Sequence, residues 1–132
     1  WIHMAINAGV TSTAARSGNL ENPEELALNL MNSSSELSLA IKAIREALKV
    51  VEARGVNLKL YKAELLPYKI PAWIAGKAMK VMFAKNELTR KIMTLHNDKQ
   101  DIFYCCQSVY LTGQELGVKM PILEANMKGI SI

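Results

Sequence analysis

The sequence predicts an all-α fold, a single helical-bundle domain that spans residues 1–132. Apolar residues recur at spacings of three and four over long stretches, which is typical of amphipathic helices. No alternating run of β-branched residues is long enough to indicate a strand. Proline is scarce, with 4 residues, and most of the 7 glycines follow the apolar stretches. We therefore expect helices joined by short connections.

The composition supports a domain with its own core. Half of the residues are hydrophobic and 21% are charged, as in ordinary globular proteins. A chain of this length removes roughly two-thirds of its unfolded surface from water, so one core suffices. The longest apolar runs, 70–74 and 81–84, are far shorter than the roughly 18 residues of a membrane-spanning helix. We expect no membrane partner.

The charge distribution and the two cysteines indicate which classes of partner and which cellular compartment to expect. The net charge is +4, but the 16 basic residues are scattered without an Arg-rich block, so we expect no nucleic-acid partner. Cys105 and Cys106 are adjacent, and a bridge between neighbours would need strained geometry. We therefore expect a reducing, cytoplasmic location. The start at Trp1 carries no signal-like segment, and we expect further sequence to precede it.

The clearest predicted helix start is Asn22-Pro23-Glu24-Glu25, where Asn can cap the helix and proline suits its first turn. Apolar residues then recur at helical spacing up to Gly55, a residue typical of a left-handed helix end. They are Leu37, Ile41, Ile44, Leu48 and Val51. The pattern predicts one long helix, bent or broken near residues 33–35 because serine hydroxyls compete for backbone hydrogen bonds.

Shorter helices are predicted in the second half. One covers 58–66 before Pro67, and another begins at Pro71. The apolar positions of the latter are Ile74, Ala78, Val81 and Met82. A further short helix covers 87–95. The last major helix begins near Asp98 and stops at Gly117, and Pro121 opens a brief terminal turn. The predicted apolar stripe of that helix is Ile102, Cys105, Cys106, Val109, Gly113 and Leu116.

Two stretches near the ends of the chain carry a family-like pattern. The first is WIHMAINAGVT, from Trp1 to Thr11, followed by the turn SGNL at 17–20. The second is 98–121, which ends in LGVKMP. Together they resemble the ketopantoate reductases, NADP-dependent enzymes that reduce a 2-keto acid in pantothenate biosynthesis. The matching family features are the helix with the catalytic lysine, the Asn-Gly-Glu-Leu turn and the Gly-hydrophobic-any-hydrophobic-Pro ending.

The resemblance implies a fold for this chain and a separate domain that binds the cofactor. The fold would be that of the C-terminal domain of ketopantoate reductase, which is 6-phosphogluconate-dehydrogenase C-terminal-like. The cofactor, NADP, would be bound mainly by an N-terminal Rossmann domain, through a glycine-rich turn at a helix start. No such turn occurs in this chain. The segment Ala75-Gly76-Lys77 lacks the first glycine and the following hydroxyl residue of a phosphate loop.

Two catalytic positions follow from the resemblance. His3 stands where the family carries its catalytic lysine, and Asp101, counted back from Gly117, where it carries a glutamate. An imidazolium can donate a proton near neutral pH, since its unperturbed pKa is about 6.5. Asp101 keeps the charge but is one methylene shorter. The alternatives are a polar residue near the chain start for His3 and a first-turn aspartate that favours the helix dipole for Asp101.

Four substrate-binding positions also follow from the resemblance. Asn7 lies four residues after His3, on the same helix face, where an amide suits a keto-acid oxygen. A hydrogen bond within the helix explains Asn7 about as well. Thr11 and Ser17 stand where the family uses asparagines, and Thr89 lies near a substrate-binding serine. These hydroxyls keep hydrogen-bonding capacity but lack the paired donor and acceptor of an amide.

The sequence therefore supports two hypotheses about function. The first is the substrate-binding domain of a ketopantoate-reductase-like oxidoreductase that acts on a small 2-keto acid and is inactive without its own N-terminal Rossmann domain. The second is a noncatalytic helical scaffold or dimerisation module that kept the fold after losing the lysine and glutamate. A homodimer through Leu37, Ile41, Ile44 and Leu48 is an alternative to burial of that stripe in the domain's own core. No metal is expected, because no histidine or cysteine pair has ligand spacing.

Overall fold

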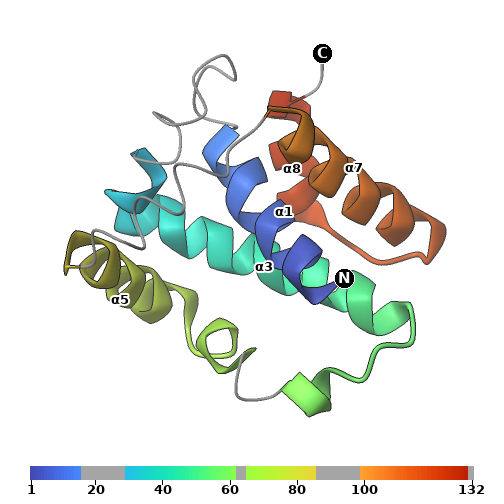
Figure 1. Cartoon of the computed structure of the whole chain (residues 1–132), viewed down its shortest axis with the longest axis horizontal. Coiled ribbons are helices and arrows are strands. Elements are labelled where there is room, and N and C mark those ends of the chain that lie inside the picture. The colour runs from blue at the N-terminus through green and yellow to red at the C-terminus, as the bar shows by residue number, and fades with distance from the viewer. Residues whose placement is uncertain (16–28, 62–64, 86–98, 131–132) are drawn as a thin grey trace.

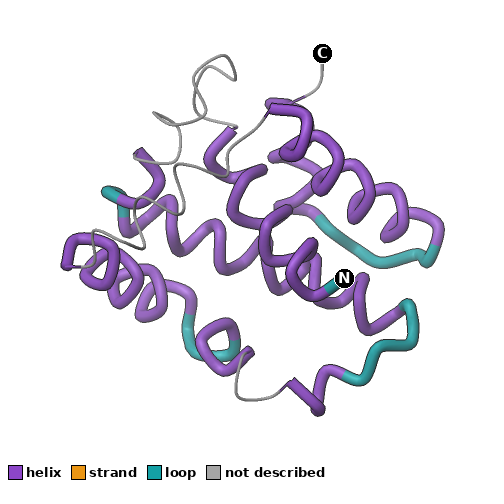
Figure 2. Tube along the Cα trace, viewed as in Figure 1, coloured by secondary structure: helices purple, strands orange, loops and turns teal. Residues whose placement is uncertain are grey.

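The described residues of the computed structural model, 1–15, 29–61, 65–85 and 99–130, are all-α, and none of them is in a strand (Figures 1 and 2). The all-α prediction is confirmed for this part of the chain. No helix within these ranges is long and apolar enough to cross a bilayer. The elements are α1 (Ile2–Ala15), α3 (Ser34–Ala53), the short 3-10 helices η1 (Leu58–Tyr61) and η2 (Leu66–Tyr68), α5 (Ala72–Lys85), α7 (Lys99–Glu115) and α8 (Pro121–Ile130).

Helix α3 is the central element, and its ends follow from local chemistry. The hydroxyl of Ser33 accepts a hydrogen bond from the backbone N–H of Glu36 at 3.3 Å, which caps the first turn. Gly55 follows the last turn with a φ of 99°, a left-handed conformation that favours glycine. The break predicted near 33–35 and the stop at Gly55 are confirmed. The predicted start at Asn22 lies outside the described residues.

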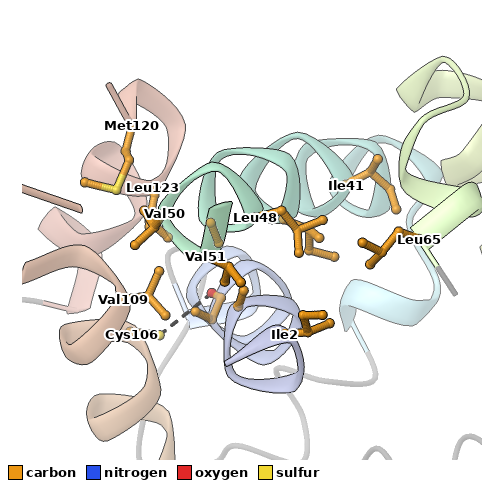
Figure 3. Close-up of a cluster of buried hydrophobic side chains, with 14 of the residues drawn as sticks. Ile2, Ile41, Leu48, Val50, Val51, Leu65, Cys106, Val109, Met120 and Leu123 are labelled. Atoms are coloured by element: carbon orange, nitrogen blue, oxygen red, sulfur yellow. Dashed lines mark hydrogen bonds between the residues drawn. The ribbon is translucent and has the colours of Figure 1, made fainter. Parts of the chain in front are cut away.

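The apolar stripe of α3 forms the core, with α1, α5, α7 and α8 packed around it (Figures 1 and 3). All five predicted stripe residues are buried, and none is more than 7% exposed. A dimer through this stripe would have to open the core. Burial in the domain's own core, the alternative to the homodimer, is the arrangement seen.

Glycine allows α1 to approach α3 closely. A Cβ on Gly9 would lie 2.4 Å from a side-chain carbon of Ile44 and 2.7 Å from its backbone nitrogen. Gly76 has the same role in α5, where a Cβ would lie 2.6 Å from the carbonyl oxygen of Ser34. Both helices therefore touch α3 backbone to backbone.

The buried face of α5 differs from the prediction. Its buried residues are Ala72, Ala75 and Gly76, and Met79 is half-buried. The predicted apolar positions are all exposed, at 41% for Ile74, 52% for Val81 and 46% for Met82, and Ala78 is exposed too. The prediction was wrong because close helix crossing selects small residues, whereas the sequence pattern selects hydrophobic ones.

The helix expected over 58–66 is only partly described. Its first residues, 58–61, form the 3-10 helix η1, Leu65 is helical, and Leu66 begins the 3-10 helix η2, which contains Pro67, whereas 62–64 lie outside the described residues. One further prediction needs correction. The brief turn expected at Pro121 is the ten-residue helix α8. The short helix predicted over 87–95 lies outside the described residues.

Helix α7 ends as predicted, at Gly117 with a φ of 71°. In its predicted stripe, Cys106, Val109 and Gly113 are buried, whereas Leu116 is 45% exposed. The side chain of Ile102 is not among those described.

Candidate functional site

Helices α1 and α7 run in opposite directions against α3 (Figure 1). The Arg54 guanidinium at the end of α3 lies 3.8 Å from the ring centroid of Trp1, so α1 is antiparallel to α3. Gly113, late in α7, faces Val50 near that same end of α3. Cys106, earlier in α7, faces the later turns of α1. The first turn of α7 therefore lies near the end of α1, and not near its start.

The contact between α1 and α7 passes through a predicted binding residue. The hydroxyl of Thr11 donates to the backbone carbonyl of Asn7 at 2.6 Å and lies 3.4 Å from the sulfur of Cys106. The thiol of Cys106 also lies 3.8 Å from the carbonyl of Ala8, the bond dashed in Figure 3.

Asn7 is exposed on α1, so its amide is accessible to a ligand. Among the predicted binding residues, Thr11 is half-buried beside Cys106, and Ser17 and Thr89 lie outside the described residues.

The backbone positions of His3 and Asp101 are separated. His3 is eight residues before Thr11, toward the start of α1, and Asp101 is five residues before Cys106, toward the start of α7. In antiparallel helices these offsets add, so the two turns lie on the order of 20 Å apart along the helix axes. The side chains of both residues are outside the described set. The described backbone does not bring the two predicted catalytic turns together.

A cavity of about 520 Å³ lies beside the second half of α3, where no site residue was predicted. Its apolar lining consists of Leu48, Val56, Leu58 and Leu65. Leu48 and Leu65 share one core cluster with Ile2, and Figure 3 shows the three on one side of the core. The cavity is therefore near the start of α1. Its volume falls within the range of ordinary ligand pockets.

The polar lining of the cavity is mainly basic. Its charged groups are four basic side chains, Arg45, Lys49, Lys59 and Lys69, and one acidic side chain, Glu52. Residues 45, 48, 49 and 52 share one helix face, so α3 presents charge beside its apolar stripe. The spacing of these four residues in the sequence could have indicated this charged face. The lining residues in 55–59 and 65–69 reach the cavity only because the connection between α3 and α5 folds back onto α3, which residue spacing does not predict.

Arg45 holds that connection against α3. Its Nε donates to the carbonyl of Tyr68 and its Nη2 donates to the carbonyl of Ile70. These two bonds tie the segment between η2 and α5 to the middle of α3. Burial raises the pKa of the Tyr68 phenol, another lining group.

A second polar cluster is fully buried between α1 and α8. The amide nitrogen of Asn126 donates to Ser12 at 3.2 Å and to Thr13 at 3.0 Å. Both hydroxyls donate in turn to the carbonyl of Gly9, which fixes the orientation of the amide. The Asn126 Oδ1 atom has no partner among the described residues. This cluster joins the two helices and opens to no described cavity.

The segment Ala75-Gly76-Lys77 does not form a phosphate-binding loop. Ala75, Gly76 and Lys77 lie inside α5, and Gly76 is packed against Ser34 and Ser38, so no loop of free backbone N–H groups is formed there. Within the described ranges, no group of three or more histidine, cysteine or acidic residues is placed to hold a metal ion.

Comparisons of this chain with protein-family models, curated proteins and solved structures give no match.

Proposed function

We propose that this chain is the helical, substrate-binding domain of a ketopantoate-reductase-like oxidoreductase, without reductase activity of its own. One observation supports the proposal. The two stretches that resemble the family stand at opposite ends of the sequence, yet they form α1 and α7, which pack together through Thr11 and Cys106. The exposed Asn7 amide beside this contact would bind an oxygen of a small 2-keto acid.

The proposed domain supplies only part of the chemistry. Reduction of a keto acid needs a hydride donor and a proton donor at the carbonyl oxygen. The cofactor, NADP, would be held by a Rossmann domain as partner, since the segment Ala75-Gly76-Lys77 offers its phosphates no loop. The His3 turn and the Asp101 turn lie far apart, so α1 and α7 alone assemble no acid–base pair. We expect the domain alone to be inactive because it lacks the Rossmann domain that would hold the hydride donor.

The same separation favours a second candidate function. A noncatalytic scaffold or assembly module would keep the helix packing and have no need to bring the two turns together. The two candidates differ in one respect that the isolated chain can report: the substrate-binding domain binds a keto acid at α1, and the scaffold does not.

An NMR titration of the ¹⁵N-labelled chain with ketopantoate tests the proposal. We expect saturable shifts of the Asn7 side-chain amide and of the Thr11 backbone amide. Asn7→Ala should weaken binding at least tenfold, whereas Asn32→Ala, at another exposed asparagine, should change it less than twofold. A folded chain with no saturable shift at Asn7 would contradict the proposal and favour the scaffold.

A turnover assay tests the second half of the proposal. NADPH oxidation by the 132-residue chain with a panel of 2-keto acids should not exceed the rate without protein. Reproducible turnover that follows the protein concentration would show that the chain holds a complete site.

A further inference from the structure

The cavity beside α3 combines two kinds of surface. Leu48 and Leu65 are 7% and 1% exposed and form an apolar floor. Lys49, Lys59 and Lys69 are exposed and form a charged rim. An apolar floor with a few charged groups at its mouth is the usual form of a pocket for a small organic ion. The ligand that matches it has an apolar body and a charged end.

Arg45 fixes the sign of that charge. Its guanidinium is half-buried and bonds to two neutral carbonyls, so no carboxylate among these partners balances its charge. A guanidinium has five N–H donors, and the two carbonyls occupy two of them, which leaves donors for an anion. A partly desolvated cation with uncommitted donors favours an anionic oxygen group.

We propose that this cavity binds a small organic anion, with its apolar body on Leu48 and Leu65 and its anionic group among Arg45 and the rim lysines. The proposal does not depend on the reductase-like function, because none of its residues carries the family resemblance. The shared chemistry is an anionic oxygen headgroup, carboxylate or phosphate, on a short hydrocarbon body.

Glu52 opposes the anion but does not outweigh the basic groups. It is exposed and is the one acidic side chain among the described lining residues, against four basic ones. A charge at the rim is screened by water and salt, so its effect on affinity is small. Glu52→Gln should therefore tighten anion binding by about threefold at low salt.

Three six-carbon probes and acetate test the headgroup and the body. Hexanoate and hexyl phosphate carry the two anionic headgroups, hexanol carries none, and acetate has no hydrocarbon body. We expect one or both six-carbon anions to bind at least tenfold more tightly than hexanol and acetate. The shifted NMR signals should be the Leu48 and Leu65 methyl groups and the Arg45 Nε–H. The tighter of the two anions then identifies the headgroup. Equal binding of hexanol, or shifts confined to other residues, would overturn the proposal.

Matched triple variants separate the cavity from general attraction by a basic protein. Lys49→Gln, Lys59→Gln and Lys69→Gln together remove the rim charges, which are exposed, so circular dichroism should show an intact fold. Lys42→Gln, Lys80→Gln and Lys119→Gln remove the same charge from exposed positions outside the described lining. We expect at least tenfold weaker binding for the first triple and less than twofold change for the second. Equal losses in both would refute a specific site.

The two binding proposals fail independently. Ketopantoate binding is judged at Asn7 on α1, and six-carbon anion binding is judged at Arg45 on α3. A chain that binds hexanoate at Arg45 without a ketopantoate response at Asn7 keeps the cavity proposal and loses the reductase-like one. A chain that responds to ketopantoate at Asn7 but does not bind hexanoate at Arg45 keeps the reductase-like proposal and loses the cavity proposal.

Discussion

The carboxylate of Glu46, in the middle of α3, accepts a hydrogen bond from the backbone N–H of Leu123 in the first turn of α8 at 2.8 Å. Its second oxygen accepts from the N–H of Ile122 at 3.0 Å. The first turn of a helix has N–H groups without partners in the helix, and it carries a partial positive charge. A carboxylate that is only 7% exposed is therefore compensated by the helix it caps.

Loss of this cap should destabilise the fold. Glu46→Ala leaves two N–H groups without partners in a largely buried place, so we expect a loss of about 2 to 4 kcal/mol in the free energy of unfolding. Glu46→Gln keeps one acceptor oxygen and should lose less. Urea unfolding followed by circular dichroism measures both. The exposed Glu52→Ala, on the same helix, should change stability by less than about 0.5 kcal/mol; an equal loss there would contradict the capping role.

The loss of stability caused by a Gly→Ala substitution should depend on the atoms that the added Cβ would contact. Gly9→Ala places a methyl group against the backbone of Ile44, which cannot move alone, so we expect a loss of about 3 kcal/mol or a shifted helix. Gly113→Ala meets the thioether end of Met120 first, at 2.5 Å, and that flexible side chain can turn away. Its loss should be smaller, below about 2 kcal/mol. Thermal unfolding of the two variants gives the order, and the reverse order would contradict the close approach at Gly9.

The exposed face of α5 should tolerate a charged residue, although the apolar pattern of the sequence predicts that this face is buried. Val81→Lys should change the free energy of unfolding by less than about 0.5 kcal/mol, because Val81 is 52% exposed. Ala75→Leu, on the buried face, should cost about 1 to 3 kcal/mol by overpacking against α3. Chemical denaturation of both variants decides which face is buried. A large loss in the free energy of unfolding for Val81→Lys, with no loss for Ala75→Leu, would show that the buried face is the one predicted from the sequence.

Cys106 should make stability fall at high pH. Burial raises the pKa of its thiol from 9.0 to about 11, so the folded state holds the proton more tightly than the unfolded state. This contribution is present in full below about pH 9 and is lost as the pH rises toward 11. The stability advantage of wild type over Cys106→Ala should therefore shrink by about 2 kcal/mol across that interval. Urea unfolding at pH 8, 9 and 10.5 measures it. A difference that stays constant with pH would show that the thiol is not shielded.

Iodoacetamide labelling gives an independent reading of the same thiol. The thiolate is the reactive form, so Cys106 should react slowly at pH 8. Cys105 is half-buried and serves as the internal comparison in peptide mapping. Equal labelling of both at pH 8 under native conditions would contradict the burial of Cys106.

Some parts of the candidate sites could be predicted from the sequence, and others could not. Asn7 lies on an exposed helix face, as the helical spacing allowed. The distance between the His3 and Asp101 turns depends on the relative direction of α1 and α7, and helical periodicity carries no information about direction. The cavity depends on Arg45 reaching the carbonyls of Tyr68 and Ile70, contacts between residues more than twenty positions apart.

Local chemistry fixed where helices begin and end. Ser33 caps α3, and Gly55 and Gly117 end helices in the left-handed conformation, because these effects act over a few neighbouring residues. Only the tertiary structure decided which face of α5 is buried, since the approach to α3 requires Gly76 and Ala75 and leaves the more hydrophobic Ile74 and Val81 outside. Tertiary packing likewise made Pro121 the start of a full helix, because Glu46 supplies from α3 the cap that the local sequence lacks.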